Sequence, residues 1–357
     1  MIKLLIVDDS ALMRRQLMNL FQAEGDFDVR PARNGDEAVR ENRDFQPDVV
    51  TLDINMPEMD GLTALSLIMA ERPVAVVMVS SLTNEGALAT FEALNLGAVD
   101  YVAKPGGTIS LSIDRITEEL VAKVRAAARC RPRGKPSSTG TVARRMQEER
   151  KKIAAASSAL AAPRSAGDGL LVVGASTGGP RALEIVLSGL PANFPWPVLV
   201  AQHMPAAFTR AFAERLNQCC ALQVVEAGSA LPVEAGKIYI ARGGADMVLA
   251  SRAGRLTVLP MPENSQFLWH PSVELLGRSV LEHYDAKRVT AVLLTGMGYD
   301  GSDAFAEIKK RGGRTIAESE ETAVVYGMPA ELVAKGGASL VLAVERVASQ
   351  LSIWAGR

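Results

Sequence analysis

The sequence predicts an α/β protein with two domains, each built on a parallel or mostly parallel sheet. Short β-rich runs alternate with helical stretches twice along the chain. At 357 residues the chain is too long for one compact core, and a segment of different composition at about residues 130–168 separates the two alternations. Its 48% hydrophobic residues and formal net charge of -1 are those of an ordinary globular protein and indicate no particular partner.

Cysteine usage and the length of the apolar runs predict a cytoplasmic protein. Cys130, Cys219 and Cys220 form no CxxC pair and no metal-ligand spacing, and an odd count does not suit a disulfide framework. Residues 1–9 pass from a short apolar stretch into acids, unlike a signal peptide. The longest apolar stretches fall far short of the roughly 20 residues that cross a bilayer, so we expect no membrane insertion.

The first alternation, at residues 1–129, predicts a parallel sheet with helices on both faces. Its β-rich runs lie at residues 4–7, 49–52, 74–79 and 101–102, and residues 11–24 have helical spacing. Polar residues stand where strands end: Asp8 and Asp9 after the first, Asp53 at the third, Ser80 at the fourth and Lys104 after the fifth. A doubly wound sheet gathers such residues at its carboxyl edge.

Those residue types fit transfer of a phosphoryl group. Three crowded carboxylates repel one another unless a divalent cation lies among them, and oxygen ligands suit Mg²⁺. Asp53 is then the nucleophile, Lys104 pairs with the new phosphate and the Ser80 hydroxyl bonds one of its oxygens. Each acid alone is better explained as a solvated loop residue, but the whole set favours a phosphorylation site.

Residues 1 to about 125 resemble the receiver domain of response regulators. The matching positions are Asp8, Asp9, Asp53, Met56-Pro57, Asp60-Gly61, Ser80, Gly97-Ala98 and Lys104-Pro105. The resemblance implies a flavodoxin-like domain with a five-stranded parallel sheet, Mg²⁺ held by the three acids, and phosphorylation of Asp53 by a histidine kinase. Tyr101 stands where the family often places a switching aromatic residue, although a half-buried strand residue explains it equally well.

The second alternation, at residues 169–357, predicts another α/β domain with a doubly wound, mostly parallel sheet. Strands are expected at 170–173, 198–201, 237–241, 289–294, 314–317 and 339–342, with helices at 272–284 and 302–311 among others. Residues 247–250 and 256–259 predict an antiparallel hairpin inserted in that sheet.

A G-x-S-x-G pattern at residues 174–178 follows the first strand of this domain and precedes a helix, the setting of a nucleophilic serine. Ser176 is its central residue. Taken alone, the pattern also fits a helix cap or an anion-binding loop. The spacing of a dinucleotide-binding loop would need glycine at position 176, and the chain contains no phosphate-binding G-x-x-x-x-G-K-[ST] loop.

A nucleophilic serine needs a base, and the chain offers three histidines. His203 follows the strand at 198–201 and is the best base, whereas His270 and His283 are interpreted as surface or packing residues. Asp300 follows the strand at 289–294 in a glycine-rich segment, residues 295–301, and is the candidate to orient the imidazole. Amides of that segment can face a developing oxyanion.

Residues 170–350 resemble the catalytic domain of CheB-type chemotaxis receptor methylesterases. The resemblance lies in Gly-Ala-Ser-Thr-Gly-Gly at 174–179, Gln-His-Met-Pro at 202–205 and Thr-Gly-Met-Gly-Tyr-Asp-Gly at 295–301, with further similarity at 208–209, 271–274 and 326–329. It implies Ser176 as nucleophile, His203 as base, Asp300 as orienting acid, and oxyanion-binding amides near Thr177 and Met297.

This resemblance also implies a reaction, partners and a domain layout. The reaction is hydrolysis of glutamate methyl esters on methyl-accepting chemoreceptors, releasing methanol, often with deamidation of receptor glutamines, and it needs no metal at the esterase step. A chemotaxis histidine kinase would be the phosphodonor. The layout is a receiver domain at 1–129, a linker at 130–168 and a catalytic domain at 169–357.

Two features depart from a simple match. The family usually has Pro-Gly-x-x-His after the strand at 237–241, but this chain has Arg-Gly-Gly-Ala-Asp at 242–246, which leaves the effect of Asp246 open. The linker is basic, with nine Lys or Arg residues and two Glu between Arg129 and Lys152, and its residues 142–160 also fit a helix. It is either a solvated spacer or a contact for a receptor or kinase surface.

The control hypothesis is that the unphosphorylated receiver covers the esterase cleft and that phosphorylation of Asp53 alters this contact. One alternative is a response regulator whose output binds nucleic acid through the basic linker, although its long glycine-rich output disfavours this. Another is a general lipase of the α/β-hydrolase fold, whose order of serine, acid and histidine would require Asp246 with His270 or His283.

Overall fold

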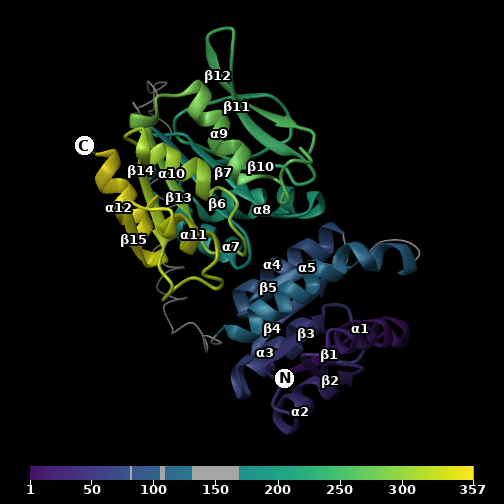
Figure 1. Cartoon of the computed structure of the whole chain (residues 1–357). Helices are drawn as coiled ribbons and strands as arrows, with labels where there is room; N and C mark the ends of the chain where they lie inside the picture. The colour runs from purple at the N-terminus through teal and green to yellow at the C-terminus, as the bar shows by residue number, and fades with distance from the viewer. Residues whose placement is uncertain (81–82, 105–108, 131–168, 357) are drawn as a thin grey trace. The chain divides into compact units, whose positions relative to one another are not determined.

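The computed structural model describes residues 1–80, 83–104, 109–130 and 169–356. The side chains of residues 80, 84–85 and 109–116 are not described, and the predicted linker after Cys130, with its candidate helix at 142–160, lies outside the described residues. The chain divides into two compact units, Met1–Ser137 and Ser138–Arg357, and each is described by itself (Figure 1). Across the described ranges, no helix is both long enough and apolar enough to cross a membrane.

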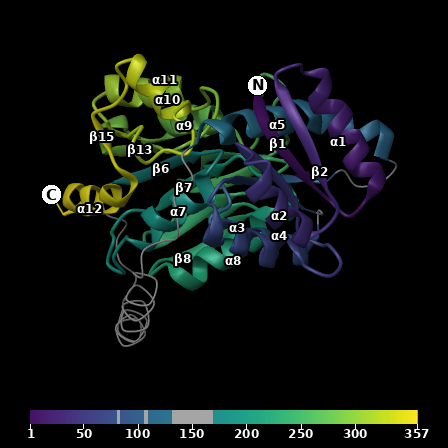
Figure 2. The ribbon, with the colours of Figure 1, turned by 90° about the horizontal axis from the view of Figure 1, so that it is seen from below.

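The first unit contains the predicted five-stranded parallel sheet, in the order β2-β1-β3-β4-β5. Its strands are β1 (Ile2–Val7), β2 (Phe27–Ala32), β3 (Val49–Asp53), β4 (Ala75–Ser80) and β5 (Asp100–Ala103). Its helices are α1 (Ala11–Ala23), α2 (Gly35–Asp44), α3 (Gly61–Glu71), α4 (Asn84–Leu96) and α5 (Ile109–Arg129). Helices α1 and α5 pack on one face of the sheet, and α2, α3 and α4 lie on the other (Figure 2).

Local sequence fixes the loops at the carboxyl edge of this sheet. Ser10 and Asp60 each accept a hydrogen bond from the amide three residues later and so cap α1 and α3. Gly61 is required at the start of α3, because a Cβ there would overlap the backbone of Asp53. The caps therefore hold the two acid-bearing loops in place.

Strand β2 is the strand of this sheet whose position the sequence did not reveal. Asp28, Arg30 and Pro31 interrupt its apolar pattern, and all three are exposed. Because β2 is an edge strand that pairs only with β1, it tolerates polar side chains and a proline that lacks an N–H.

The second unit contains a seven-stranded parallel sheet in the order β15-β14-β13-β6-β7-β10-β8, which confirms the predicted α/β class. Its strands are β6 (Leu170–Ala175), β7 (Val198–Gln202), β8 (Gln223–Ala227), β10 (Lys237–Ala241), β13 (Val289–Leu293), β14 (Arg314–Glu318) and β15 (Leu340–Leu342). Its helices are α7 (Gly179–Ser188), α8 (Ala206–Cys219), α9 (Val273–His283), the 3-10 helix η1 (Ala286–Arg288), α10 (Ser302–Lys310), α11 (Met328–Ala334) and α12 (Val344–Ala355). Helices α9, α10 and α11 cover one face, and α7, α8 and α12 the other (Figure 2).

The order of these strands determines where a site can form. From β6 the chain builds the sheet outward through β7 to β10 and β8, then returns to place β13 on the other side of β6. A crevice opens outside the carboxyl ends of the strands at such a reversal. The three neighbouring strands there, β13, β6 and β7, are the ones that lead into Asp300, Ser176 and His203.

The predicted hairpin is present, but it lies outside the seven-stranded sheet. Strands β11 (Asp246–Arg252) and β12 (Arg255–Met261) pair antiparallel and form a separate three-stranded sheet with β9 (Leu231–Pro232). Ala253 and Gly254, both with positive φ, make the two-residue turn. The inner side chains of the hairpin pack against α9, and the Leu249 amide donates to the Ser279 hydroxyl at 2.9 Å.

Candidate active site

The serine elbow is tied to the strands on both sides of it. The Ser176 amide donates to the Thr295 carbonyl at 3.0 Å, and its own carbonyl accepts from the Gly179 amide at 2.7 Å and from Gln202 Nε2 at 2.9 Å. Gly178, with φ of +76°, allows the chain to turn sharply into α7. These bonds fix a tight turn whose half-buried serine side chain projects at the end of β6.

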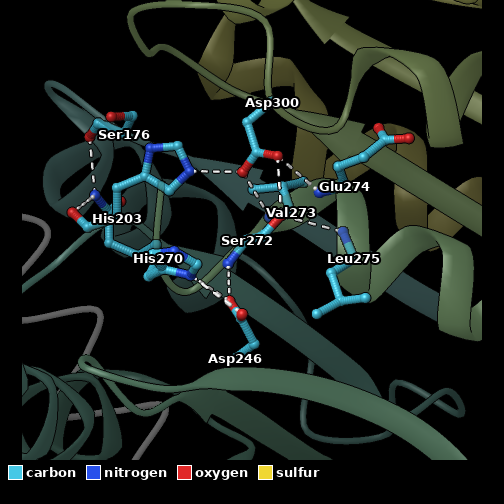
Figure 3. A network of polar contacts seen from close by, with 10 residues as sticks. Ser176, His203, Asp246, His270, Ser272, Val273, Glu274, Leu275 and Asp300 are labelled. Atoms are coloured by element: carbon cyan, nitrogen blue, oxygen red, sulfur yellow. Dashed lines mark hydrogen bonds and ion pairs between the residues drawn. The ribbon is translucent and has the colours of Figure 1, made fainter. Parts of the chain in front are cut away.

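His203 links the elbow to Asp300. Its amide donates to the Ala175 carbonyl at 3.1 Å, next to the serine, and its Nε2 lies 2.8 Å from Asp300 Oδ2. The imidazole lies between Ser176 and Asp300 in Figure 3. Both side chains of the pair are largely buried, with 9% of His203 and 3% of Asp300 exposed, so water screens their interaction weakly.

The first turn of α9 holds Asp300. Its Oδ1 accepts from the Ser272 hydroxyl at 3.1 Å and the Glu274 amide at 3.0 Å, and its Oδ2 accepts from the Val273 amide at 2.7 Å. Burial alone would raise the pKa of Asp300, but the hydrogen bond and charge of His203, with the two amides, outweigh it and leave the pKa below its ordinary value. Asp300 is therefore an acceptor at neutral pH.

The tautomer of His203 follows from this charge. An ionised carboxylate has no proton to give, so Nε2 carries the hydrogen, and in the neutral imidazole the lone pair therefore lies on Nδ1. Nδ1 is buried and has no hydrogen-bond partner in the described part of the chain. A buried acceptor without a partner is rare, and here it leaves the imidazole ready to take a proton.

The two loops expected to bind an oxyanion are joined by Thr295. Its hydroxyl donates to the Thr177 carbonyl at 2.9 Å and accepts from the Val325 amide at 2.9 Å. Within the described ranges the amides of Thr177 and Met297 donate to no acceptor, so both remain available. Gly296 permits the close approach of the loops, since a Cβ there would lie 2.7 Å from the Cβ of Ser176.

Trp269 forms part of the site and was not anticipated from the sequence. Its ring stacks on that of His203, with centroids 5.9 Å apart and planes inclined by 5°. Tyr299, half of whose surface is exposed, meets the Trp269 ring edge-on at 5.1 Å. No motif in the sequence links a tryptophan at 269 to a histidine at 203, because the contact depends on the path of the loop before α9.

His270, interpreted from the sequence as a surface or packing residue, is partly buried and has a specific partner. Its Nδ1 lies 2.9 Å from Oδ1 and 3.1 Å from Oδ2 of Asp246, and its side chain is only 16% exposed. The acid at position 246 therefore has a defined partner, as Figure 3 shows. His283, at the end of α9, is exposed as expected.

In the first unit, the predicted acids lie together at the carboxyl edge. Asp8, Asp9 and Asp53 each offer an oxygen within 4.8 Å of the others, a donor set that fits Mg²⁺. Lys104 Nζ lies 2.7 Å from Asp53 Oδ2 and 2.8 Å from Asp8 Oδ2. Burial raises the pKa of Asp53, and the nearby Lys104 offsets only part of this rise. Burial alone would lower the pKa of Lys104, but Asp53 and Asp8 outweigh burial, so the pKa of Lys104 is raised.

The remaining receiver predictions have mixed outcomes. Tyr101 is buried rather than half-buried, with 3% of its surface exposed, and burial raises its pKa well above the ordinary value. Its carbonyl accepts a hydrogen bond of 2.8 Å from Lys123 Nζ. The side chain of Ser80 and the whole of Pro105 lie outside the described residues.

Comparison with known proteins matches both units. The family model described as CheB methylesterase matches residues 171–351, and the response regulator receiver domain model matches residues 4–113. A Rhodospirillum rubrum protein named protein-glutamate methylesterase/protein-glutamine glutaminase 3 is 54% identical, covering 100% of this chain and 97% of its own length. A relative from Rhodopseudomonas palustris, with the same name but numbered 2, is 52% identical over 99% of this chain and 98% of its own. The crystal structure of the Thermotoga maritima CheB methylesterase catalytic domain is 36% identical with a TM-score of 0.50, covering 52% of this chain and 98% of that one.

Proposed function

Because the chain belongs to the CheB methylesterase family and carries a response regulator receiver domain before the catalytic domain, we propose that it demethylates chemoreceptors under phosphorylation control. Its substrates are glutamate methyl esters, which yield glutamate and methanol, and receptor glutamines, which it deamidates. The matched domain occupies the output segment, so the nucleic-acid-binding alternative is not retained. The observation that carries the proposal is the Asp300–His203 pair beside the serine elbow, with the free Nδ1 of His203.

In the proposed mechanism, Ser176 Oγ attacks the ester carbonyl while its proton passes to Nδ1 of His203. Asp300 stabilises the resulting imidazolium through the 2.8 Å contact with Nε2. The free amides of Thr177 and Met297 receive the negative charge that develops on the carbonyl oxygen. Collapse of this intermediate breaks the ester C–O bond, and the leaving methoxide takes the proton from Nδ1 to give methanol.

The second half of the reaction returns the enzyme to its starting state. Water attacks the acyl group on Ser176, gives its proton to His203 Nδ1, and forms a second tetrahedral intermediate. Breakdown of this intermediate releases glutamate, and the serine oxygen recovers the proton from the imidazolium. With a glutamine substrate the same steps release ammonia in place of methanol, and the acyl-enzyme is identical.

We place the receiver domain at residues 1–129, the linker at 130–168 and the catalytic domain at 169–357. Asp8, Asp9 and Asp53 would hold Mg²⁺, which when bound neutralises charge on the phosphoryl oxygens. Asp53 accepts the phosphoryl group from a chemotaxis histidine kinase. Lys104, now paired with Asp8 and Asp53, then pairs with the phosphate, and Ser80 and Tyr101 report its arrival.

Control is proposed to act through the receiver, whose phosphorylation changes the relative free energies of an inactive and an active state of the chain. A chain that begins near residue 165 should be highly active and should not respond to a phosphodonor. An inactive but folded truncation would count against inhibition by the receiver.

The test of the esterase assignment is methanol release from methylated receptor membranes. Ser176→Ala and His203→Ala should each abolish release, whereas His283→Ala, at the exposed end of α9, should match the wild type. Equal release by wild type and Ser176→Ala would refute the proposed nucleophile.

A further inference from the structure

We infer that Asp246 and His270 form a positioning pair that closes the loop at residues 264–272 and thereby sets both Asp300 and Trp269 against His203. The inference rests on the proposed role of His203 as the base. It also assigns a task to Asp246, which stands where the family usually has histidine. Neither residue is expected to touch the substrate.

Asp246 joins the two ends of the loop. Its Oδ2 accepts from the Asn264 amide at 3.0 Å, and its Oδ1 accepts from the Ser272 amide at 2.7 Å. The Asp246 side chain has no exposed surface, so a buried charge is held at the start of β11. One carboxylate thus closes the loop. The hydrogen bonds that offset the entropy cost of closing the loop go to a charged acceptor, and such bonds are stronger than bonds between neutral groups.

His270 supplies the third donor from inside the loop. A buried carboxylate is costly unless donors or an opposite charge surround it, and Nδ1 of His270 approaches both of its oxygens. With two backbone amides and this imidazole, both oxygens of Asp246 are satisfied. The pair therefore explains why an acid is tolerated at a position without solvent.

The anchored end of the loop is the part that holds Asp300. Ser272 gives its amide to Asp246 and its hydroxyl to Asp300, and the next two amides, of Val273 and Glu274, also donate to Asp300. Fixing the backbone at Ser272 therefore fixes three of the four hydrogen bonds of Asp300, and the fourth is its contact with His203 (Figure 3).

The same loop carries Trp269, whose ring stacks on the imidazole of His203. Its ring lies parallel to the His203 ring, and a Cβ built on Gly298 would come within 2.6 Å of it. Trp269 is therefore packed between the imidazole and the glycine-rich loop that bears Met297. Loosening the closure should displace Trp269 and Asp300 together, because both depend on the same nine-residue segment.

The test compares variants of the full-length protein by methanol release from methylated receptor membranes, with kcat and KM measured across pH. Asp246→Ala should lower kcat by about 10- to 100-fold with little change in KM, the size expected when a catalytic group is slightly misplaced. Asp246→Asn, which can still accept at one oxygen, should lose less. His270→Leu should lower kcat more than His270→Asn, because asparagine retains an N–H donor near the position of Nδ1.

The pH profile separates positioning from a general loss of stability. Loosening Asp300 weakens its electrostatic contact with the imidazole that acts as base, so the acid limb of kcat/KM should move to lower pH. A purely structural defect would reduce kcat/KM equally at every pH. His283→Ala serves as the matched histidine control.

Three results would overturn the inference. If folded Asp246→Ala and His270→Leu keep the wild-type kcat and acid limb, the pair has no positioning role. If kcat/KM falls equally at all pH values, the role of the pair is only structural. Loss in His270→Leu as complete as in His203→Ala would make His270 the base, as the lipase order of Ser176, Asp246 and His270 requires. If Asp246→Ala does not fold, the His270→Asn and His270→Leu pair decides, since both leave the two amide bonds to Asp246 intact. Full activity of Ser176→Ala would instead refute the proposed function itself.

Discussion

Replacing Asp300 by asparagine removes the charge that faces His203 while nearly preserving the shape of the side chain. The carboxylate accepts from His203 Nε2 and the Val273 amide at Oδ2, and from Ser272 and the Glu274 amide at Oδ1. The new amide nitrogen must take the position of either Oδ1 or Oδ2, and in both positions it faces a backbone N–H. The substitution should cost stability as well as activity, about 1–3 kcal/mol for a buried group left unsatisfied.

The activity loss follows from the lost charge. Two charges roughly 4 Å apart interact by about 4 kcal/mol at the effective dielectric constant of about 20 that suits protein sites. An imidazolium forms in the transition state, so Asp300→Asn should lower kcat by about 10³-fold, since each 1.36 kcal/mol is about tenfold. The measurement is methanol release at a temperature where circular dichroism shows the variant to be folded.

Asp303→Asn is the matched control for this substitution. Asp303 lies in the first turn of α10, its side chain is 61% exposed, and its contact is the ion pair with Lys335. Exposed ion pairs contribute about 0–1 kcal/mol, so this variant should keep near-normal activity. If folded Asp300→Asn loses less than about tenfold in kcat, the electrostatic role assigned to Asp300 is refuted. A tenfold loss corresponds to only about 1.4 kcal/mol, well below the interaction of about 4 kcal/mol expected here.

Two further predictions follow from the same site. Gly296→Ala places a Cβ 2.7 Å from that of Ser176, so kcat should fall by about 10²-fold, whereas Gly228→Ala, whose Cβ meets no atom closer than 3.6 Å, should behave as wild type in the same assay. Because the pKa of Asp300 is lowered, its stabilising effect is fully present above the ordinary carboxyl pKa of about 3.9 and is lost as pH falls through the lower folded value. Thermal unfolding of wild type and Asp300→Asn should therefore converge as the pH falls below the ordinary carboxyl pKa; a difference that does not shrink as the pH falls would contradict this sign.

The sequence was informative wherever chemistry stands at the end of a buried parallel strand. Such strands are continuous apolar runs, and their carboxyl ends meet at one edge. The sequence alone therefore groups Asp8 with Asp53 in one unit, and Ser176 with His203 and Asp300 in the other. Their positions in the structure agree with that grouping, and their chemical roles stay predictions.

The sequence was less informative where position depends on packing or on edges. Strands β2 and β8 lie at sheet edges, where apolar runs are short or interrupted, and the hairpin could not be assigned to its own sheet from its turn alone. The pairing of Asp246 with His270 spans 24 positions and a hairpin, and no residue pattern specifies it. Trp269 likewise reaches His203 only through the closed loop.

The central claim is that phosphorylation of the receiver controls a serine esterase in the same chain. Its most direct test measures methanol release from methylated receptor membranes by wild type, Ser176→Ala and Asp53→Asn, each with and without Mg²⁺ and a small phosphodonor. Methanol release should require Ser176, should rise with the phosphodonor in wild type and should not rise in Asp53→Asn. Release that ignores the phosphodonor in wild type, or that rises equally in Asp53→Asn, would contradict it.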